Sequence, residues 1–171
     1  MQRGVEMKPA LFTAARDGQV DEVRHLLAAG GDIEERDGSE GSELQGHSPL
    51  QIAAYKGRAD VVMVLLEHGA DISSTNDYGW TPLHLASFAS FEETVRILLD
   101  KGADLNSKTT APDGKTPEVL AISRQNLQVV AMLRAEAVRR EEVRLAQLLE
   151  SDQCWAFAMV LAAVLLIALY S

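Results

Sequence analysis

The chain repeats itself along its length. The segment of residues 47–72, HSPLQIAAYKGRADVVMVLLEHGADI, aligns without a gap with residues 80–105, WTPLHLASFASFEETVRILLDKGADL. Matching residues such as Pro49 and Pro82 lie 33 positions apart throughout this alignment. Self-similarity at a fixed period of this size is the signature of a repeat array, in which each unit buries its apolar face against its neighbours.

Two weaker copies flank the matched pair. Residues 11–33 carry the same pattern 39 positions before the second unit, and residues 115–133 carry it 35 positions after the third. The six extra residues fall in 37–46 and the two extra residues in 108–114. Insertions confined to the connections are what a stacked array tolerates. The expected repeat domain covers 8–137, with units at about 8–46, 47–79, 80–114 and 115–137.

Each unit carries the local signals of two helices. Pro82 stands where a first helical turn tolerates a missing N–H, and Thr81 before it is suited to N-capping. The corresponding pairs are Ser48-Pro49 and Thr116-Pro117. Later in each unit, apolar residues recur at helical spacing until Gly69 or Gly102, which suit the end of a helix.

On these residues the sequence resembles the ankyrin repeat family. The run Thr81-Pro82-Leu83-His84, the Gly-Ala-Asp endings and the period carry the resemblance. It implies an all-α solenoid, in which each unit is an antiparallel helix pair with a hairpin-like loop, and a role for His84 in tying loops together. Ser90 stands where the family usually has glycine, which leaves the tightness of the turn at 88–91 open.

The end units depart from the pattern as caps do. The first has Lys8-Pro9-Ala10-Leu11 in place of Thr-Pro-Leu-His. The last has Glu118 and Arg134 where the inner units have leucine. Terminal units turn one face to water, so polar replacements are expected there.

Charge and cysteine content restrict the class of protein. The formal net charge of −9 argues against a nucleic-acid ligand, whose phosphates require a basic surface. Cys154 is the single cysteine, so no intrachain disulfide is possible and a reducing compartment is expected. The first dozen residues hold no apolar run of secretory length, so no signal peptide is expected.

The sequence after the repeats predicts a linker helix. No Gly or Pro occurs from Glu118 to Ser171. Residues 138–153 have a partial apolar stripe among many charges, which is typical of an amphipathic helix. Whether this stripe docks on a partner or is simply solvated is left open.

Residues 154–170 predict a transmembrane anchor. These seventeen residues contain no charge, Gly or Pro, and as a helix they would span roughly 25 Å, close to the thickness of a thin internal bilayer. Trp155 and Tyr170 suit the two interfaces. The residues expected in the membrane are Cys154, Trp155, Phe157, Leu161, Leu165, Leu166 and Tyr170.

The segment resembles the tail-anchored class. Arginines lie on its N-terminal side and no Lys or Arg follows Tyr170, so the repeats are expected in the cytosol, with the endoplasmic reticulum or another internal membrane favoured. Two alternatives stay open: a soluble regulatory or inhibitory subunit whose apolar helix packs into a partner, or a fragment of a larger ankyrin-bearing membrane protein. Cys154 is a possible site of S-acylation.

No constellation for catalysis, a cofactor, a metal or a small-molecule substrate is recognised. The four histidines lie in different units at no metal-ligand spacing. The Gly-rich stretch 37–46 lacks the lysine and the strand-to-helix context of a phosphate loop. No Ser or Cys stands in a nucleophile motif, so the protein is expected not to be an enzyme.

The resemblance implies that a protein partner binds loop tips and the exposed side of the first helices. The positions of this sequence that match are His47, Tyr55, Lys56, Asp77, Tyr78, Trp80, Phe88, Lys101, Lys115 and Arg124. Four aromatic rings are concentrated there although the chain is only 5% aromatic, and the cations among them suit a partner with acidic groups. Alternatively, the rings merely cover neighbouring units. The expected function is a membrane-tethered adaptor for a protein partner.

Overall fold

The computed structural model describes residues 10–38 and 46–150. The helices in these ranges are α1 (Ala10–Asp17), α2 (Val20–Ala28), α3 (Pro49–Tyr55), α4 (Ala59–Glu67), α5 (Pro82–Ala89), α6 (Glu92–Asp100), α7 (Pro117–Ser123) and α8 (Leu127–Glu150). The expected anchor at 154–170, with Cys154 and the other residues named in it, lies outside the described part of the chain. Within that part, no helix is both long and apolar enough to cross a membrane.

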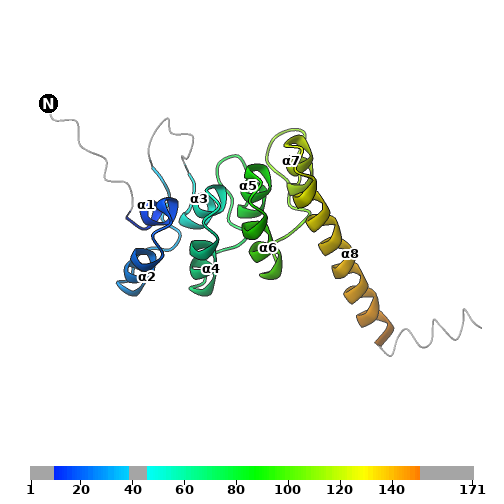
Figure 1. Ribbon diagram of the computed structural model, residues 1–171, viewed down its shortest axis with the longest axis horizontal. Helices are drawn as coiled ribbons and strands as arrows, with labels where there is room; N and C mark the ends of the chain where they lie inside the picture. The colour runs from blue at the N-terminus through cyan, green and yellow to red at the C-terminus, as the bar shows by residue number, and fades with distance from the viewer. Residues whose placement is uncertain (1–9, 39–45, 151–171) are drawn as a thin grey trace, which may run out of the picture. The chain divides into compact units, whose positions relative to one another are not determined.

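The helices stack in pairs, as an all-α repeat solenoid requires. Helices α1, α3, α5 and α7 form one row, and each contacts the next (Figure 1). Helices α2, α4 and α6 form a second row, and each packs against its partner in the first. Among the described residues, those up to 133 make up one compact unit and those from 134 onward another.

The beginnings of α3 and α5 confirm the capping predicted from the sequence. Ser48 accepts a hydrogen bond from the Gln51 backbone N–H, and the Gln51 side chain accepts one from the Ser48 N–H at 2.9 Å. Thr81 and His84 form the same reciprocal pair in α5. These bonds satisfy N–H groups that a helix start leaves without partners, which fixes where each first helix begins.

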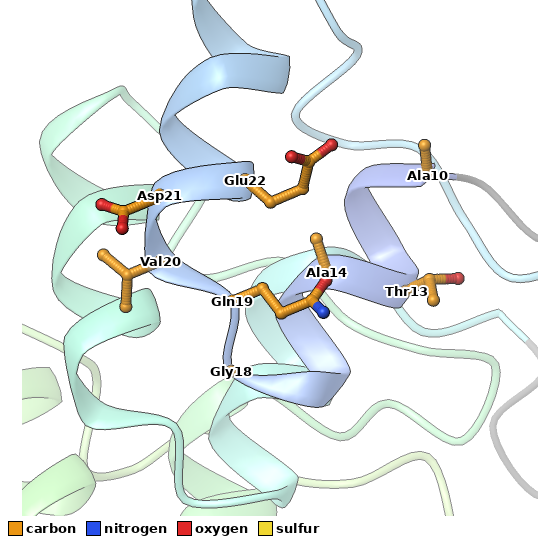
Figure 2. Close-up of a pocket in the computed structure, with 8 residues that line it drawn as sticks. All are labelled: Ala10, Thr13, Ala14, Gly18, Gln19, Val20, Asp21 and Glu22. Carbon is orange, nitrogen blue, oxygen red and sulfur yellow. The ribbon is translucent and has the colours of Figure 1, made fainter.

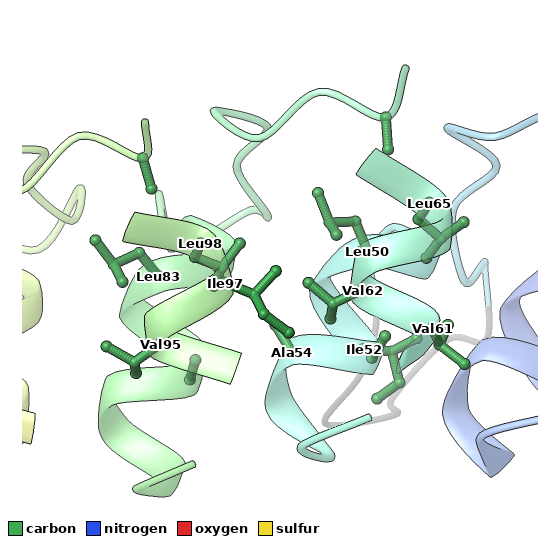
Figure 3. Close-up of a cluster of buried hydrophobic side chains, with 14 of the residues drawn as sticks. Leu50, Ile52, Ala54, Val61, Val62, Leu65, Leu83, Val95, Ile97 and Leu98 are labelled. Carbon is green, nitrogen blue, oxygen red and sulfur yellow. The ribbon is translucent and has the colours of Figure 1, made fainter. Parts of the chain in front are cut away.

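The core consists of side chains at equivalent positions of successive units (Figure 3). Leu50 and Leu83 come from the first helices, and Leu65 and Leu98 come from the second helices. All four are at most 1% exposed. Because the same positions are buried in both inner units and the core cluster also includes residues of the first and last units, the apolar core continues along the stack instead of closing within one unit.

The turn between the two helices of a pair is the same in all four units. Gly18, Gly57, Ser90 and Gln125 occupy equivalent positions, and all have a left-handed backbone, with φ between 58° and 80°. Ser90 therefore keeps the tight turn even though it lacks the freedom of glycine. An L-residue in this conformation costs about 1–2 kcal/mol.

The two ends of the array are finished differently. In the first unit, Thr13 and Glu22 replace Ile52 and Val61 of the second, which are buried. The N-terminal end face is thus polar, as expected of a cap. In the last unit Glu118 is half-buried, while Val119 and Ile122 are 44% and 49% exposed. That end face is therefore mixed, not wholly polar.

Helix α8 runs without a break from the last unit into the stretch where a linker helix is expected. Beyond Leu133, Glu136 forms ion pairs with Arg139 and Arg140, each at 2.6 Å. These hydrogen bonds, that from Arg139 above all, lower the pKa of Glu136. Val138, Leu145 and Leu148 are 49–59% exposed and supply the partial apolar stripe of this stretch.

Candidate partner-binding site

The hairpin before α5 presents two aromatic residues. The Asn76 side-chain oxygen accepts hydrogen bonds from the backbone N–H groups of Tyr78, at 3.0 Å, and Trp80, at 2.9 Å. The Asn76 backbone N–H donates to the Trp80 carbonyl, and Gly79 donates to the Asn76 carbonyl. One buried amide therefore fixes the loop that carries both rings. Sequence reasoning missed Asn76, although Asn is a frequent turn-forming residue.

This hairpin, α3 and α5 enclose a pocket of about 170 Å³. Its walls are largely aromatic, and Leu85, which is 4% exposed, is the most deeply buried of its apolar residues. The lining residues are His47, Tyr55, Asn76, Tyr78, Trp80, Leu85 and Phe88. Five of these are positions that the sequence assigns to partner binding, and the fold brings them together. Leu85 and Asn76 were not foreseen.

The aromatic rings of the pocket are ordered against one another. Trp80 and Phe88 meet edge to face, with centroids 5.3 Å apart and planes at 77°. Tyr55, Trp80 and Phe88 are half-buried, whereas Tyr78 is 66% exposed at the rim. The rings cover part of the neighbouring units, but Tyr78 does so least. Rings held in this way offer contact area with little loss of conformational freedom on binding.

Two of the four predicted cations lie on these rings. The Lys56 ammonium is 5.1 Å from the centroid of Tyr55, and the Arg124 guanidinium is 4.7 Å from that of Phe88. Lys115 pairs instead with Asp113 at 3.2 Å. Lys101 follows the last residue of α6 and does not line the pocket.

Asp77 sits at the tip of the same hairpin and is exposed. Its carboxylate lies against Gly46, where a side-chain carbon would come within 2.9 Å of it. In the neighbouring loop, Arg36 donates hydrogen bonds to the carbonyls of Gly46 and Thr75, both at 2.8 Å. Successive hairpins are thus joined, and the rim of the pocket is held by loop-to-loop contacts.

His84 ties α5 to the loop of the next unit, as the resemblance implies. Its Nε2 lies 3.0 Å from the Lys115 carbonyl, which can only accept, and its Nδ1 accepts from the Thr81 N–H at 3.2 Å. The ring is therefore neutral, with its proton on Nε2. Burial lowers the pKa of His84, since it penalises the charged imidazolium. This histidine is structural and lies behind the pocket wall formed by Trp80, 6.5 Å away.

A larger groove, of about 950 Å³, lies on the end face of the first unit. Figure 2 shows its side chains along α1 and the start of α2, including Thr13, Gln19 and Glu22. Two of them, Thr13 and Glu22, stand at positions that hold the buried Ile52 and Val61 in the second unit. The groove is thus at the open end of the stack, and its lining mixes polar residues with Ala10, Ala14 and Val20.

Comparison with known proteins places the chain in a family. A profile of the family described as ankyrin repeats (3 copies) matches residues 11–109 and 77–144. The chain therefore belongs to the ankyrin repeat family, whose repeats are in general protein-interaction modules and not enzymes.

One relative is named for the same repeats. The ankyrin repeat-containing protein ITN1 of Arabidopsis thaliana is 41% identical to this chain over 66 residues. These residues are 39% of this chain and 10% of that protein. The chain thus spans only about a tenth of the relative's length.

Proposed function

We propose that the protein is an adaptor that holds a protein partner at the cytosolic face of an internal membrane, such as the endoplasmic reticulum. The observation that carries the partner-binding half is the aromatic pocket, in which Tyr55, Tyr78, Trp80 and Phe88 converge. Half-exposed aromatic side chains around a small pocket are typical of the residues that dominate protein interfaces. The repeats provide a rigid frame for them.

The tethering half rests on the sequence of residues 154–170. Seventeen uncharged residues with an aromatic residue near each end suit a single membrane span. Arginines, among them Arg139, Arg140 and Arg144, precede the segment, which favours repeats on the cytosolic side. Anchoring would raise the local concentration of a bound partner at the membrane and so promote its encounters there.

Proximity labelling in cells tests both halves. The full chain, a Tyr78→Ala variant and a chain lacking 154–170 would each carry the labelling enzyme. Met63→Ala is a matched control, because Met63 is a 40% exposed apolar residue on α4, in the other row of helices. We expect a subset of proteins to be labelled by the full chain and by Met63→Ala but not by Tyr78→Ala. Loss of 154–170 should remove the membrane proteins from the labelled set.

An alkaline carbonate wash of membranes separates this proposal from the soluble alternative. An integral anchor keeps the protein in the pellet. Release into the supernatant would favour a soluble regulatory subunit whose apolar helix packs into a partner, and it would end the tethering half of the proposal.

A further inference from the structure

We infer that the aromatic pocket receives one apolar side chain from a linear, acidic segment of the partner. The inference rests on the proposed partner-binding function and specifies its ligand. Its subject is the pocket between the hairpin before α5 and the helices α3 and α5.

The size of the pocket limits the occupant to about one side chain. Pockets for drug-sized ligands and cofactors have volumes of ~300–1,000 Å³, whereas this pocket has about 170 Å³. The walls are Tyr55, Trp80 and Phe88, with Leu85 among them. A leucine, isoleucine, methionine or phenylalanine side chain matches such walls in size and polarity.

The two buried polar side chains of the wall, Asn76 and His47, are already engaged within the protein. The Asn76 side-chain oxygen accepts from two backbone N–H groups, and its nitrogen lies 3.3 Å from Nε2 of His47. An occupant therefore does not have to supply hydrogen bonds to these two buried groups. This favours an apolar group over a polar one beside Asn76 and His47, because both side chains are already bonded and would not replace the water that a polar group loses there.

The charges around the rings distinguish an apolar occupant from a cationic one. Aromatic boxes can also hold ammonium groups. Here, however, the faces of Tyr55 and Phe88 already carry Lys56 and Arg124. A further cation in the pocket would be repelled by both.

The same cations favour acidic residues beside the apolar one. Lys56 follows α3 and Arg124 follows α7, so they flank α5 from the units on either side. Both are exposed and accessible to carboxylates of a bound segment. Two carboxylates stand in the hairpins before α5 and α7: Asp77 at the tip of the first, and Asp113, which is paired with Lys115, in the second.

The test measures peptide binding to the full chain in detergent micelles. The chain has two tryptophans, so Trp155→Phe leaves Trp80 as the one fluorescent reporter, inside the pocket. The probes are four sets of short synthetic peptides: a central Leu among Asp and Glu, a central Ala among Asp and Glu, a central Leu among Lys and Arg, and a central trimethyllysine.

We expect the leucine-acidic peptides to shift Trp80 emission and to bind about tenfold or more tightly than the alanine-acidic ones, as burial of one apolar side chain predicts. The leucine-basic and trimethyllysine peptides should bind at least tenfold more weakly than the leucine-acidic ones. Added salt should weaken the binding of the leucine-acidic peptides, since it screens interactions between exposed charges.

Variants assign the effect to the pocket. Phe88→Ala should remove the preference for Leu over Ala, and Lys56→Glu with Arg124→Glu should reverse the preference for acidic over basic peptides. Arg96→Glu is the matched control, because it reverses one exposed cation on α6, in the other row of helices, and should alter neither preference. Circular dichroism should report the same helical content for all variants.

Three outcomes would overturn the inference: tightest binding by the trimethyllysine peptides, no preference for Leu over Ala, or no binding of any peptide set. None of them would remove the proposed function, because the proximity-labelling result for Tyr78→Ala is obtained with the natural partner in cells. If that labelling is unchanged while the leucine-acidic peptides bind as expected, the pocket chemistry is right and the cellular role is wrong.

Discussion

His84 and Gln51 occupy equivalent positions and form equivalent bonds. Gln51 donates to the carbonyls of Ser74, at 2.9 Å, and Trp80, at 3.3 Å, and it accepts from the Ser48 N–H. His84 bridges Thr81 and Lys115 in the same way. Two chemically different side chains therefore join a helix start to the next loop, and one of them titrates.

We predict that His84→Gln removes an acid-sensitive part of the stability. Because burial lowers the pKa of His84 in the fold, the unfolded chain takes up the proton first as the pH falls. The contribution of His84 to the free energy of unfolding is thus fully present above its ordinary pKa of about 6.5 and declines as the pH falls below that value. Urea unfolding measures the free energy of unfolding at pH about 7.5 and about 5.5. Its decrease between the two pH values should be smaller for His84→Gln than for the natural chain.

The exposed His25 provides the control for this prediction. His25→Gln should keep the acid-dependent loss of the natural chain. If His84→Gln lost as much stability between the two pH values as the natural chain does, other groups would cause the acid sensitivity.

Replacing Ser90 with glycine should stabilise the fold. Its φ of 67° is one that glycine adopts without strain. Ser90→Gly should raise the free energy of unfolding by about 0.5–1 kcal/mol, once the greater freedom of the unfolded chain is subtracted from the relief of strain. Thermal denaturation measures this. Ala89→Gly, one residue earlier at the end of α5, should have the opposite sign.

A side chain at Gly57 should clash with Phe91 of the next unit. A side-chain carbon at Gly57 would lie 2.4 Å from a ring carbon of Phe91, whereas one at Gly30 would meet nothing within 4 Å. Both glycines have positive φ, so both alanine variants carry backbone strain. Gly57→Ala should lower the free energy of unfolding by about 1–3 kcal/mol more than Gly30→Ala does, because it also overpacks the contact with Phe91.

A double-mutant cycle with Phe91→Ala checks the origin of this cost. If the ring is the obstacle, Gly57→Ala should be less destabilising in the Phe91→Ala background. Simple additivity of the two changes would show that Phe91 is not involved.

At the scale of elements, the hairpin before α5 depends on Asn76. Asn76→Ala would leave the N–H groups of Tyr78 and Trp80 without their acceptor. Because an unsatisfied buried group costs about 1–3 kcal/mol, the variant should be less stable and its hairpin less ordered. We expect its partner binding to fall further than its stability alone explains, measured at a temperature where it remains folded. Unchanged binding would mean that the hairpin is not part of the site.

The sequence predicts the elements better than it predicts the site. The period, the Thr-Pro pairs and the helical spacing were sufficient for the helix pairs and for the capping at Ser48 and Thr81. The aromatic positions could be assigned because the family places variable residues on the first helices and loop tips. Leu85 and Asn76 could not, since their place in the pocket depends on how two neighbouring units meet. For the same reason, the sequence could not separate Lys56, which lies on a ring, from Lys101, which does not line the pocket.

In the whole molecule, the repeat array should fold without the apolar C-terminal segment. The array has its own continuous core, so removing 154–170 should leave the repeats folded. We predict that a chain ending at residue 150 has the far-ultraviolet circular dichroism of a helical protein and melts cooperatively in buffer without detergent. An unfolded or aggregated product would instead make the C-terminal segment part of the fold.

If the partner binds at the aromatic pocket, site-specific photo-crosslinking should capture it there. A photoreactive phenylalanine analogue would replace Tyr78 at the rim of the pocket or, separately, Met63 on α4, both of which are exposed. We expect the partner to crosslink at position 78 and not at position 63. A partner that crosslinks at position 63 and not at position 78 would contradict this expectation.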